Sequence, residues 1–586
     1  MKKLLAFALL CVCLCFGTMF AHAQEQTVVE HKGDIYQVYL QALQKYNIET
    51  QQWEDIMPLP VEEYARNQLI DVNGKLYLAI HDNYTDYKIF EIHLQDKKTV
   101  PAFPFMREIN EAFIEQIAIG PKNIYVFTRQ YLETGSKSVL HRYSHDGVET
   151  GSIRVAEEDL ATFGIYQDDV YIATVSNGIQ IWKDDALISY SRTEMPKQLV
   201  NCIYNSADDH FYLYDATYIY KYEKDHTLKK IAVHNEGELG NAMIICNNQI
   251  WMANSATEKG KIEMFPYALD GKVEETGLIH VQGAFKASDL NRFNHSNTEK
   301  LLAVFAEPDS NADVQIYESS QNVFKNQSAA DLLDLSKSEK LQSYYKKLYP
   351  FIAEKAKVND KYLLLPYNIF NYDYDSISIF NLGIYAEHAK HLQIPTQYAS
   401  YKEFIDTMLK VLQENPNLQG IDVYSYQRIK ASIKQLAALQ YKSLTTEQQQ
   451  YIADLYAGLD AMLKLDYNRE SYPNLITIQY DLLERTNGYV PLNLKLDKNG
   501  KYSQAAYLDL ICINKNAPQA IAFVEYLVEQ QNISNQAKLF QDFSVPKNMP
   551  YDPRLSKLKE YQDHVNEIKI IDYAYLQQDT GMQDNG

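Results

Sequence analysis

Apolar and polar residues alternate along most of residues 30–275, and one short apolar pattern returns six times in that stretch. In most copies an aromatic residue stands between two apolar ones, and successive aromatics are 41, 48, 46, 41 and 39 residues apart. Alternation with a period of two predicts β-strands, and repetition at this spacing is typical of β-propeller blades. The six marker aromatics are Tyr36, Tyr77, Tyr125, Tyr171, Tyr212 and Trp251.

Each repeat contains the signals of more than one strand. Most copies follow a polar turn, and a second aromatic strand arrives 10 to 18 residues after the first. One blade cannot bury both of its faces alone, so blades stack around a common axis. We therefore expect an all-β propeller of about six four-stranded blades over residues 24–275, with the repeated aromatics in its core. A β-sandwich is the alternative, although it does not require so regular a spacing.

The first repeat carries a family resemblance. Residues 45–60, KYNIETQQWEDIMPLP, resemble a kelch motif in their order of aromatic, turn, tryptophan and proline, but the double glycine usual in kelch blades is missing. The resemblance implies a kelch-like propeller, a fold that hosts both enzymes and docking surfaces.

Catalytic motifs are missing from the sequence. It contains no HExxH, GxSxG, P-loop or CxxC pattern. The histidines of the first half are scattered and mostly near turns: His81, His141, His145, His210, His226 and His234. We therefore expect no enzyme activity, no cofactor and no metal site.

From about residue 278 the pattern changes to short apolar strands alternating with amphipathic helices, which predicts an α/β domain over residues 276–586. Ser400 and Glu403 form a capping-box signature, and the residues after them place apolar side chains on one helical face. Pro518 stands in the first turn of a predicted helix, and residues 452–463 carry another apolar stripe. We interpret these stripes as core.

The order of segments in this half carries a second resemblance. Residues 347–370 end in a strand, LLLPYNIF, and residues 487–491 read NGYVP. Residues 505–532 form a strand and a helix, and residues 544–549 read SVPKNM. In this order the segments resemble the extracellular solute-binding proteins of ABC importers, the family of the maltose- and oligosaccharide-binding proteins.

The resemblance implies a periplasmic-binding-protein-like domain: two α/β lobes joined by crossing strands, with a cleft that closes on a solute by hinge motion. It also implies an ABC permease as partner. The first lobe is abbreviated, because only a few residues separate its second and third strands. No tryptophan follows Trp251, so tyrosines would stack against a sugar.

The loop after residue 366 is the richest candidate for ligand contacts, since it sets aromatic rings beside amides and carboxylates. With tyrosines of the other lobe and of the returning strand, the candidates are Tyr367, Asn368, Tyr372, Asp373, Tyr374, Tyr424, Tyr426 and Tyr480. A tyrosine-rich loop packed on the propeller is the structural alternative. Asp373 and Asp375 also suit calcium or a glycosidase couple, but both lie on one short loop without further ligands.

The N-terminus predicts a secretory leader. Lys2 and Lys3 precede an apolar stretch over residues 4–16, and residues 21–23, AHA, form a small-x-small cleavage site. Residues 1–23 are then a signal peptide, with an uncleaved anchor as the alternative. We expect the mature chain to be exported and soluble, and to work outside the cell, at its surface or in the periplasm.

Three cysteines remain after cleavage of the leader: Cys202, Cys246 and Cys512. Each lies in an apolar strand-like run, so we expect buried free thiols. A Cys202–Cys246 disulfide is the alternative.

Three functions are compatible with these observations. The formal net charge of −20 argues against nonspecific binding to nucleic acid or anionic lipid. The first function is capture of a small solute, an oligosaccharide, for an ABC importer, with the propeller as docking or accessory module. The second is a surface scaffold or sensor whose propeller binds a protein or glycan, and the third is a glycan-active enzyme built on the propeller. The sequence favours the first.

Overall fold

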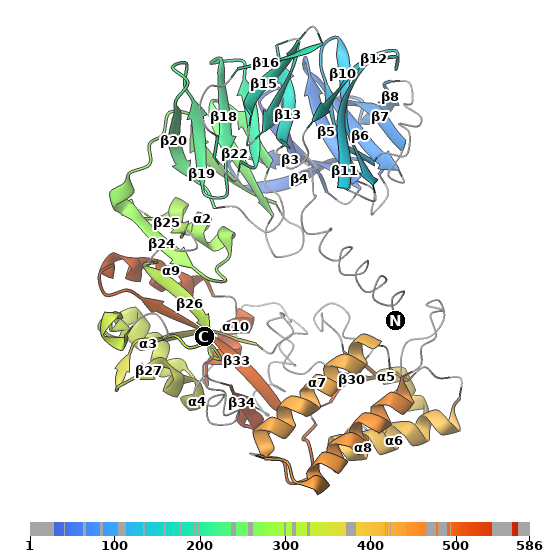
Figure 1. Cartoon of the computed structure of the whole chain (residues 1–586), viewed down its shortest axis with the longest axis vertical. Helices are drawn as coiled ribbons and strands as arrows, with labels where there is room; N and C mark the ends of the chain where they lie inside the picture. Colours follow the sequence, from blue (N-terminus) through green and yellow to red (C-terminus); the bar gives the residue numbers. More distant parts are fainter. Residues whose placement is uncertain are drawn as a thin grey trace. The chain divides into compact units, whose positions relative to one another are not determined.

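The structure is a computed structural model of the whole chain (Figure 1). It describes residues 28–571 except 40, 62–65, 83–85, 104–112, 133–134, 156–159, 168, 175–176, 184, 191–194, 197–198, 236–241, 256–261, 298–299, 307–311, 325–327, 371–381, 396, 417, 419, 422, 442, 464–475, 479–488, 493, 532 and 542–564. The predicted signal peptide therefore lies outside the described residues. The chain divides into two compact units, residues 1–278 with 286–305, and residues 279–285 with 306–586.

The first unit contains a six-bladed β-propeller, drawn in blue to green in Figure 1. Each blade is an antiparallel sheet whose strands follow one another in the sequence. The blades are β1–β4 (Val28–His31, Asp34–Tyr39, Ala42–Asn47, Gln52–Pro58), β5–β8 (Arg66–Val72, Lys75–Asp82, Asp86–His93, Lys98–Pro101), β9–β12 (Phe113–Ile119, Asn123–Leu132, Gly135–Ser144, Glu149–Val155), β13–β16 (Leu160–Tyr166, Asp169–Thr174, Gly178–Lys183, Ala186–Ser189), β17–β20 (Asn201–Asn205, His210–Tyr214, Tyr218–Tyr222, Leu228–Val233) and β21–β23 (Ala242–Cys246, Gln249–Ser255, Ile262–Ala268).

The blade count and the buried aromatics agree with the sequence pattern. All six marker aromatics are at most 7% exposed and lie in the second strand of their blades. The sixth blade differs from the prediction, because it has three strands among the described residues. After β23 the chain runs through a 3-10 turn, Glu275–Gly277, into β24 (Leu278–Gln282) rather than into a fourth blade strand.

The ring closes by packing between the first and sixth blades. The first strands of successive blades contact one another in order, and β21 contacts β1. At this seam the indole N–H of Trp53 donates to the carbonyl of Ile262 at 2.9 Å, and the Cys246 thiol and the Asn247 amide both donate to the carbonyl of Gly33. Within the described residues no strand is shared between two blades, so side chains hold the seam.

A helix and a strand that follow β24 also belong to the first unit: α2 (Ala287–Ser296) and β25 (Leu302–Phe305). Asn291 of α2 exchanges hydrogen bonds with the backbone of Asn235, and both residues are fully buried. The guanidinium of Arg292 forms a two-pronged ion pair with Glu263 of β23. These contacts attach α2 to the last two blades.

The second unit is α/β. Its sheet has the strand order β24-β26-β33-β29, with β34 beside β33; β26 is Val314–Glu318, β29 Leu365–Phe370, β33 Gln504–Ile513 and β34 Ile568–Ile570. The helices near this sheet in the sequence are α3 (Glu339–Lys347), α4 (Pro350–Ala353), α9 (Ile521–Gln530) and α10 (Ile533–Leu539), and β27 (Lys357–Val358) and β28 (Lys361–Tyr362) form a short hairpin. Four further 3-10 turns are Ala329–Asp331, Leu335–Lys337, Glu354–Ala356 and Pro518–Ala520, and a fifth, Val565–Glu567, precedes β34.

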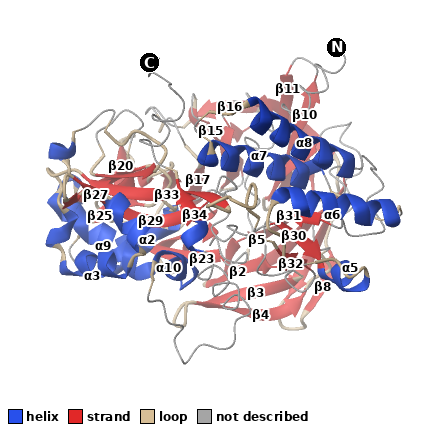
Figure 2. Ribbon diagram, turned by 90° about the horizontal axis from the view of Figure 1, so that it is seen from below, coloured by secondary structure: helices blue, strands red, loops and turns tan. Residues whose placement is uncertain are grey.

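A helical region with its own core lies between β29 and β33 in the sequence. It holds α5 (Ala386–His391), α6 (Tyr401–Glu414), α7 (Val423–Gln440), α8 (Thr446–Met462) and a small sheet of β31 (Ile476–Ile478), β30 (Leu382–Tyr385) and β32 (Tyr489–Pro491). Figure 2 shows α6, α7 and α8 side by side, and their buried apolar residues form one cluster. The Ser400 cap and the apolar stripes of α6, α8 and α9 are as the sequence predicts.

Among the described residues, none of the helices combines the length and apolar character needed to span a bilayer. The three cysteines of the described chain are buried and unpaired, as expected.

Candidate ligand-binding site at the crossing strands

The chain leaves the second unit's main sheet through β29 and returns to it through β33. These two strands are antiparallel neighbours, and β33 also pairs with β26. Asn368 of β29 and Glu318 of β26 both stand opposite Asp509 of β33. Directly opposite residues point to the same face of a sheet, so an amide and two carboxylates form one row across three strands.

The polar row is hydrogen-bonded internally. The side-chain amide of Asn368 donates to the Asp509 carboxylate at 3.1 Å, and the hydroxyl of Ser320 donates to Glu318. Burial, with a further contribution from Glu318, raises the pKa of Asp509 to about 6, and the Asn368 bond partly opposes this rise. The carboxyl group therefore changes protonation close to neutral pH.

Tyr367 forms a β-bulge beside this row. The register of β29 against β33 shifts between Pro366 and Asn368, which places Tyr367 at the irregularity. Its carbonyl accepts side-chain amide bonds from Gln531 at 2.7 Å and from Asn535 of α10 at 2.8 Å. The bulge is thus fixed to the C-terminal helices, and it sets the direction of Asn368.

Two aromatic rings continue the same face toward the helical region. Phe370 stands opposite Tyr507, and their ring centroids are 6.0 Å apart. Because Tyr507 is two residues from Asp509, and Phe370 is two residues from Asn368, all four side chains share one face. Leu439 of α7 and Phe370 both pack against the buried cluster that contains Tyr507. Amide, carboxylates and rings therefore stand together where the chain crosses between sheet and helical region.

The sequence-predicted site residues fall into three groups. Tyr367 and Asn368 belong to the site just described. Tyr372, Asp373, Tyr374 and Tyr480 lie outside the described residues. Tyr424 and Tyr426 lie in the first turns of α7.

The side chain of Tyr426 is engaged between two helices. Its hydroxyl donates to Asp460 of α8 and accepts a bond from Lys430 at 3.0 Å. The Lys430 ammonium also lies over the rings of Tyr426 and Tyr456. The described contacts of Tyr426 therefore join α7 to α8.

Sequence reasoning also considered Phe370 as part of the candidate loop, but it missed Glu318, Asp509 and Tyr507. A signal was present for one of them, because Asp509 interrupts the otherwise apolar run AAYLDLICI. A single carboxylate within a buried strand needs a partner or a function. The pairing that brings Glu318 and Asn368 to it joins strands about 140 to 190 residues apart in the sequence, so no local pattern reports it.

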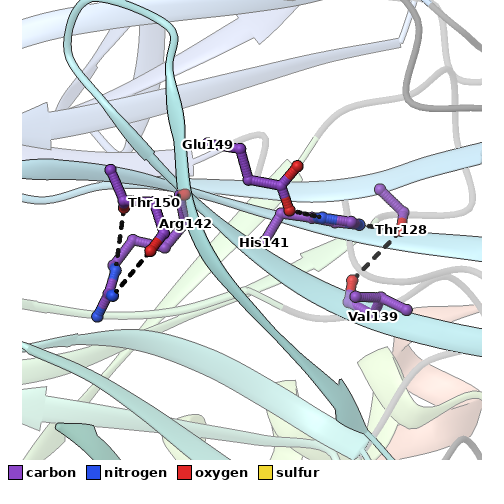
Figure 3. A network of polar contacts seen from close by, with 6 residues as sticks. All are labelled: Thr128, Val139, His141, Arg142, Glu149 and Thr150. Carbon is purple, nitrogen blue, oxygen red and sulfur yellow. Dashed lines mark hydrogen bonds and ion pairs between the residues drawn. The ribbon is translucent and has the colours of Figure 1, made fainter. Parts of the chain in front are cut away.

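The third blade contains a chain of polar contacts that resembles a catalytic relay. Figure 3 shows Thr128, His141 and Glu149 in a row: His141 Nδ1 lies 2.9 Å from a Glu149 oxygen, and Nε2 lies 3.1 Å from the Thr128 hydroxyl. Hydroxyl, imidazole and carboxylate is the order of a nucleophile, a base and an orienting acid. Thr128, however, is 2% exposed in the middle of β10. A nucleophile needs access to substrate, so we interpret this chain as a clamp across β10, β11 and β12.

Arg142 extends that clamp to the next blade. Its guanidinium donates to Thr150 of β12, as Figure 3 also shows, and to Asp185 at 2.6 Å, and it lies over the ring of Trp182. In the part of the chain that the structure describes, no three histidine, cysteine, aspartate or glutamate side chains gather so as to hold a metal ion.

No family model and no curated protein matches this chain. Among solved structures, maltose-bound MalE3 of T. maritima aligns with 51% of this chain and 90% of its own, at 11% identity and a TM-score of 0.34. A gluconolactonase, XC5397 from Xanthomonas campestris, aligns over 42% and 88% at 11% identity and a TM-score of 0.29. The mitotic checkpoint complex aligns over 43% and 78% at 7% identity and a TM-score of 0.25. Similarity at this level assigns neither a ligand nor an activity to this chain.

Proposed function

We propose that this chain is an exported solute-binding protein that captures an oligosaccharide for an ABC importer, with the propeller as docking or accessory module. One observation carries the proposal: the adjacent antiparallel strands β29 and β33 set an amide, a carboxylate and aromatic rings on one face where the chain crosses, and β26 adds a second carboxylate. Adjacent crossing strands are the element around which a two-part domain closes on its ligand.

The side chains favour an oligosaccharide over other small solutes. Sugar hydroxyls require acceptors and donors in fixed directions, which Asp509 and Asn368 supply, while rings such as Phe370 and Tyr507 supply apolar area. The two carboxylates of the row disfavour an anionic solute. A neutral, hydroxyl-rich ligand fits this combination.

The test is a binding screen on the mature chain, residues 24–586. Neutral oligosaccharides of glucose, mannose and xylose are compared with short peptides and amino acids by thermal shift, and hits are measured by isothermal titration calorimetry. A ligand at 100 times its dissociation constant stabilises its binding unit by about 2.7 kcal/mol, which shifts the melting transition clearly. We expect a selective oligosaccharide hit.

Matched variants connect the hit to the site. Asp509→Asn and Asn368→Ala should each weaken binding about tenfold or more, since each removes a hydrogen-bonding group from the row. Asp406→Asn, on the exposed face of α6, makes the same chemical change away from the row and should leave the affinity unchanged. Silence across the panel from a folded sample, or equal affinity of all variants, would contradict the proposal and favour the scaffold or sensor function.

A further inference from the structure

A cluster of aromatic rings lies between the fourth and fifth blades. Phe211 of β18 is fully buried, and Tyr166, Tyr190 and Tyr204 surround it with ring centroids 5.0 to 5.7 Å from its own. Tyr166 also lies 4.6 Å from Tyr204 and 5.7 Å from Tyr190. The three tyrosines are partly exposed, so rigidly packed rings reach the surface here. We call Tyr166, Tyr190, Tyr204 and Asp209 the tyrosine patch.

A carboxylate stands at the rim of these rings. The hydroxyl of Tyr204 donates to Asp209 at 2.8 Å, and the side chain of Asp209 is 56% exposed. Burial, with a contribution from Asp209, raises the pKa of Tyr166, of Tyr190 and of Tyr204. The three tyrosine side chains therefore lie within electrostatic range of one carboxylate. Lys224 lies 3.8 Å from the same group, an exposed and weak ion pair.

The patch is ordered before any ligand arrives. Each tyrosine ring packs against two or more aromatic neighbours, and the turn that carries Asp209 has a left-handed backbone, with φ of 57°. Packed rings lose little conformational entropy on binding. A ligand therefore meets preformed apolar area beside an acceptor for hydrogen bonds.

We propose that the tyrosine patch is a second binding site, for a neutral glycan chain. Tyrosine rings offer area to the C–H faces of sugars, their hydroxyls both donate and accept, and Asp209 accepts from sugar hydroxyls. Anionic polymers are disfavoured, because Asp208, Asp209 and Glu223 lie on neighbouring turns of the fifth blade. The propeller thereby holds a polymeric glycan, in addition to the solute site proposed above at β29 and β33.

The experiment uses the mature chain and affinity gel electrophoresis in gels that contain soluble neutral polysaccharides: a β-glucan, a xylan, a mannan or a starch. Binding retards the protein in one of these gels. Two controls separate glycan binding from general charge effects. One is a gel that contains a negatively charged polysaccharide. In the other, the basic protein lysozyme is added as a competitor. Asp509→Asn, which alters only the site in the second unit, should leave the retardation unchanged and so keeps the two proposals distinguishable.

Conservative variants test the patch without disturbing the blades. Tyr204→Phe and Asp209→Asn keep ring and turn, because asparagine tolerates the left-handed backbone, and each should weaken retardation about threefold to tenfold. Tyr220→Phe is the control for Tyr204→Phe, because it removes a similar tyrosine–aspartate hydrogen bond elsewhere. Asp185→Asn is the control for Asp209→Asn, because Asp185 is another aspartate with a left-handed backbone. Both controls should leave the retardation unchanged. Any one of three results would overturn the proposal. These are equal retardation of all four variants, no retardation in any gel, and loss of retardation only with the basic competitor.

Discussion

Replacing Asn291 by alanine should destabilise the propeller unit by about 3 kcal/mol. The Asn291 side chain accepts from the backbone N–H of Asn235 at 2.9 Å and donates to the backbone carbonyl of Asn235 at 2.9 Å. Both residues are 0% exposed. The substitution leaves one buried N–H and one buried carbonyl without these partners, and each such loss costs about 1 to 3 kcal/mol.

Tryptophan fluorescence during urea unfolding measures this effect selectively. All three tryptophans of the chain, Trp53, Trp182 and Trp251, belong to the propeller unit, so their signal follows that unit alone. Asn205→Ala is the matched control, because Asn205 caps an exposed turn with a single long bond to Ala207 and should cost under about 1 kcal/mol. An Asn291→Ala midpoint equal to that of the control would refute the view that α2 is anchored through Asn235.

Three further predictions concern the second unit and the thiols. The pKa of Asp509 is raised from 3.8 to about 6, so this group's stabilisation is full below pH 3.8 and is lost as the pH rises through 6. Asp509→Asn should therefore raise the free energy of unfolding by about 3 kcal/mol at pH 8 and leave it unchanged at pH 3.5, measured by helical circular dichroism; an equal gain at both pH values would contradict this. Gly283→Ala should lower the free energy of unfolding by about 2 kcal/mol or more in the same assay, because φ is +106° and the added Cβ would lie 2.4 Å from Ile316 Cγ2. An unfolding midpoint equal to that of the wild type would show that the backbone there relaxes freely. In the mature chain, Cys202, Cys246 and Cys512 are buried, so a thiol reagent should label none of them in native protein and all three after denaturation; fewer than three labelled thiols would reveal a disulfide.

The propeller was predictable because its signal is local and repeated. The marker aromatics recur once per blade. Each lies in the second strand of its blade, and each is buried there. The attachment of α2 was not predictable in this way. It depends on a hydrogen bond between Asn235 and Asn291, which are 56 positions apart in the sequence. The helix that carries Asn291, α2, reads as part of the α/β pattern that follows the propeller.

The candidate site was predictable only along β29, at Tyr367, Asn368 and Phe370. Tyr367 and Asn368 stand in a segment that resembles a known family, whereas Glu318 and Asp509 join them through pairing between distant strands. Register between such strands is decided by the whole sheet, which a linear pattern does not encode. The bulge at Tyr367 depends on Gln531 and Asn535, whose amides lie far along the chain.

The seam between the first and sixth blades has a genetic consequence. Within the described residues each blade is one uninterrupted stretch of sequence, and the ring closes through contacts such as that of Trp53 with Ile262. A recombination event in the turns between blades would therefore duplicate or delete a whole blade and leave every remaining strand with its original neighbour. The angle between neighbouring blades would change at every interface of the ring, so the packing between blades would need to adapt. The hydrogen bonding within each blade would remain intact, so a change in blade number would alter side-chain packing rather than strand pairing.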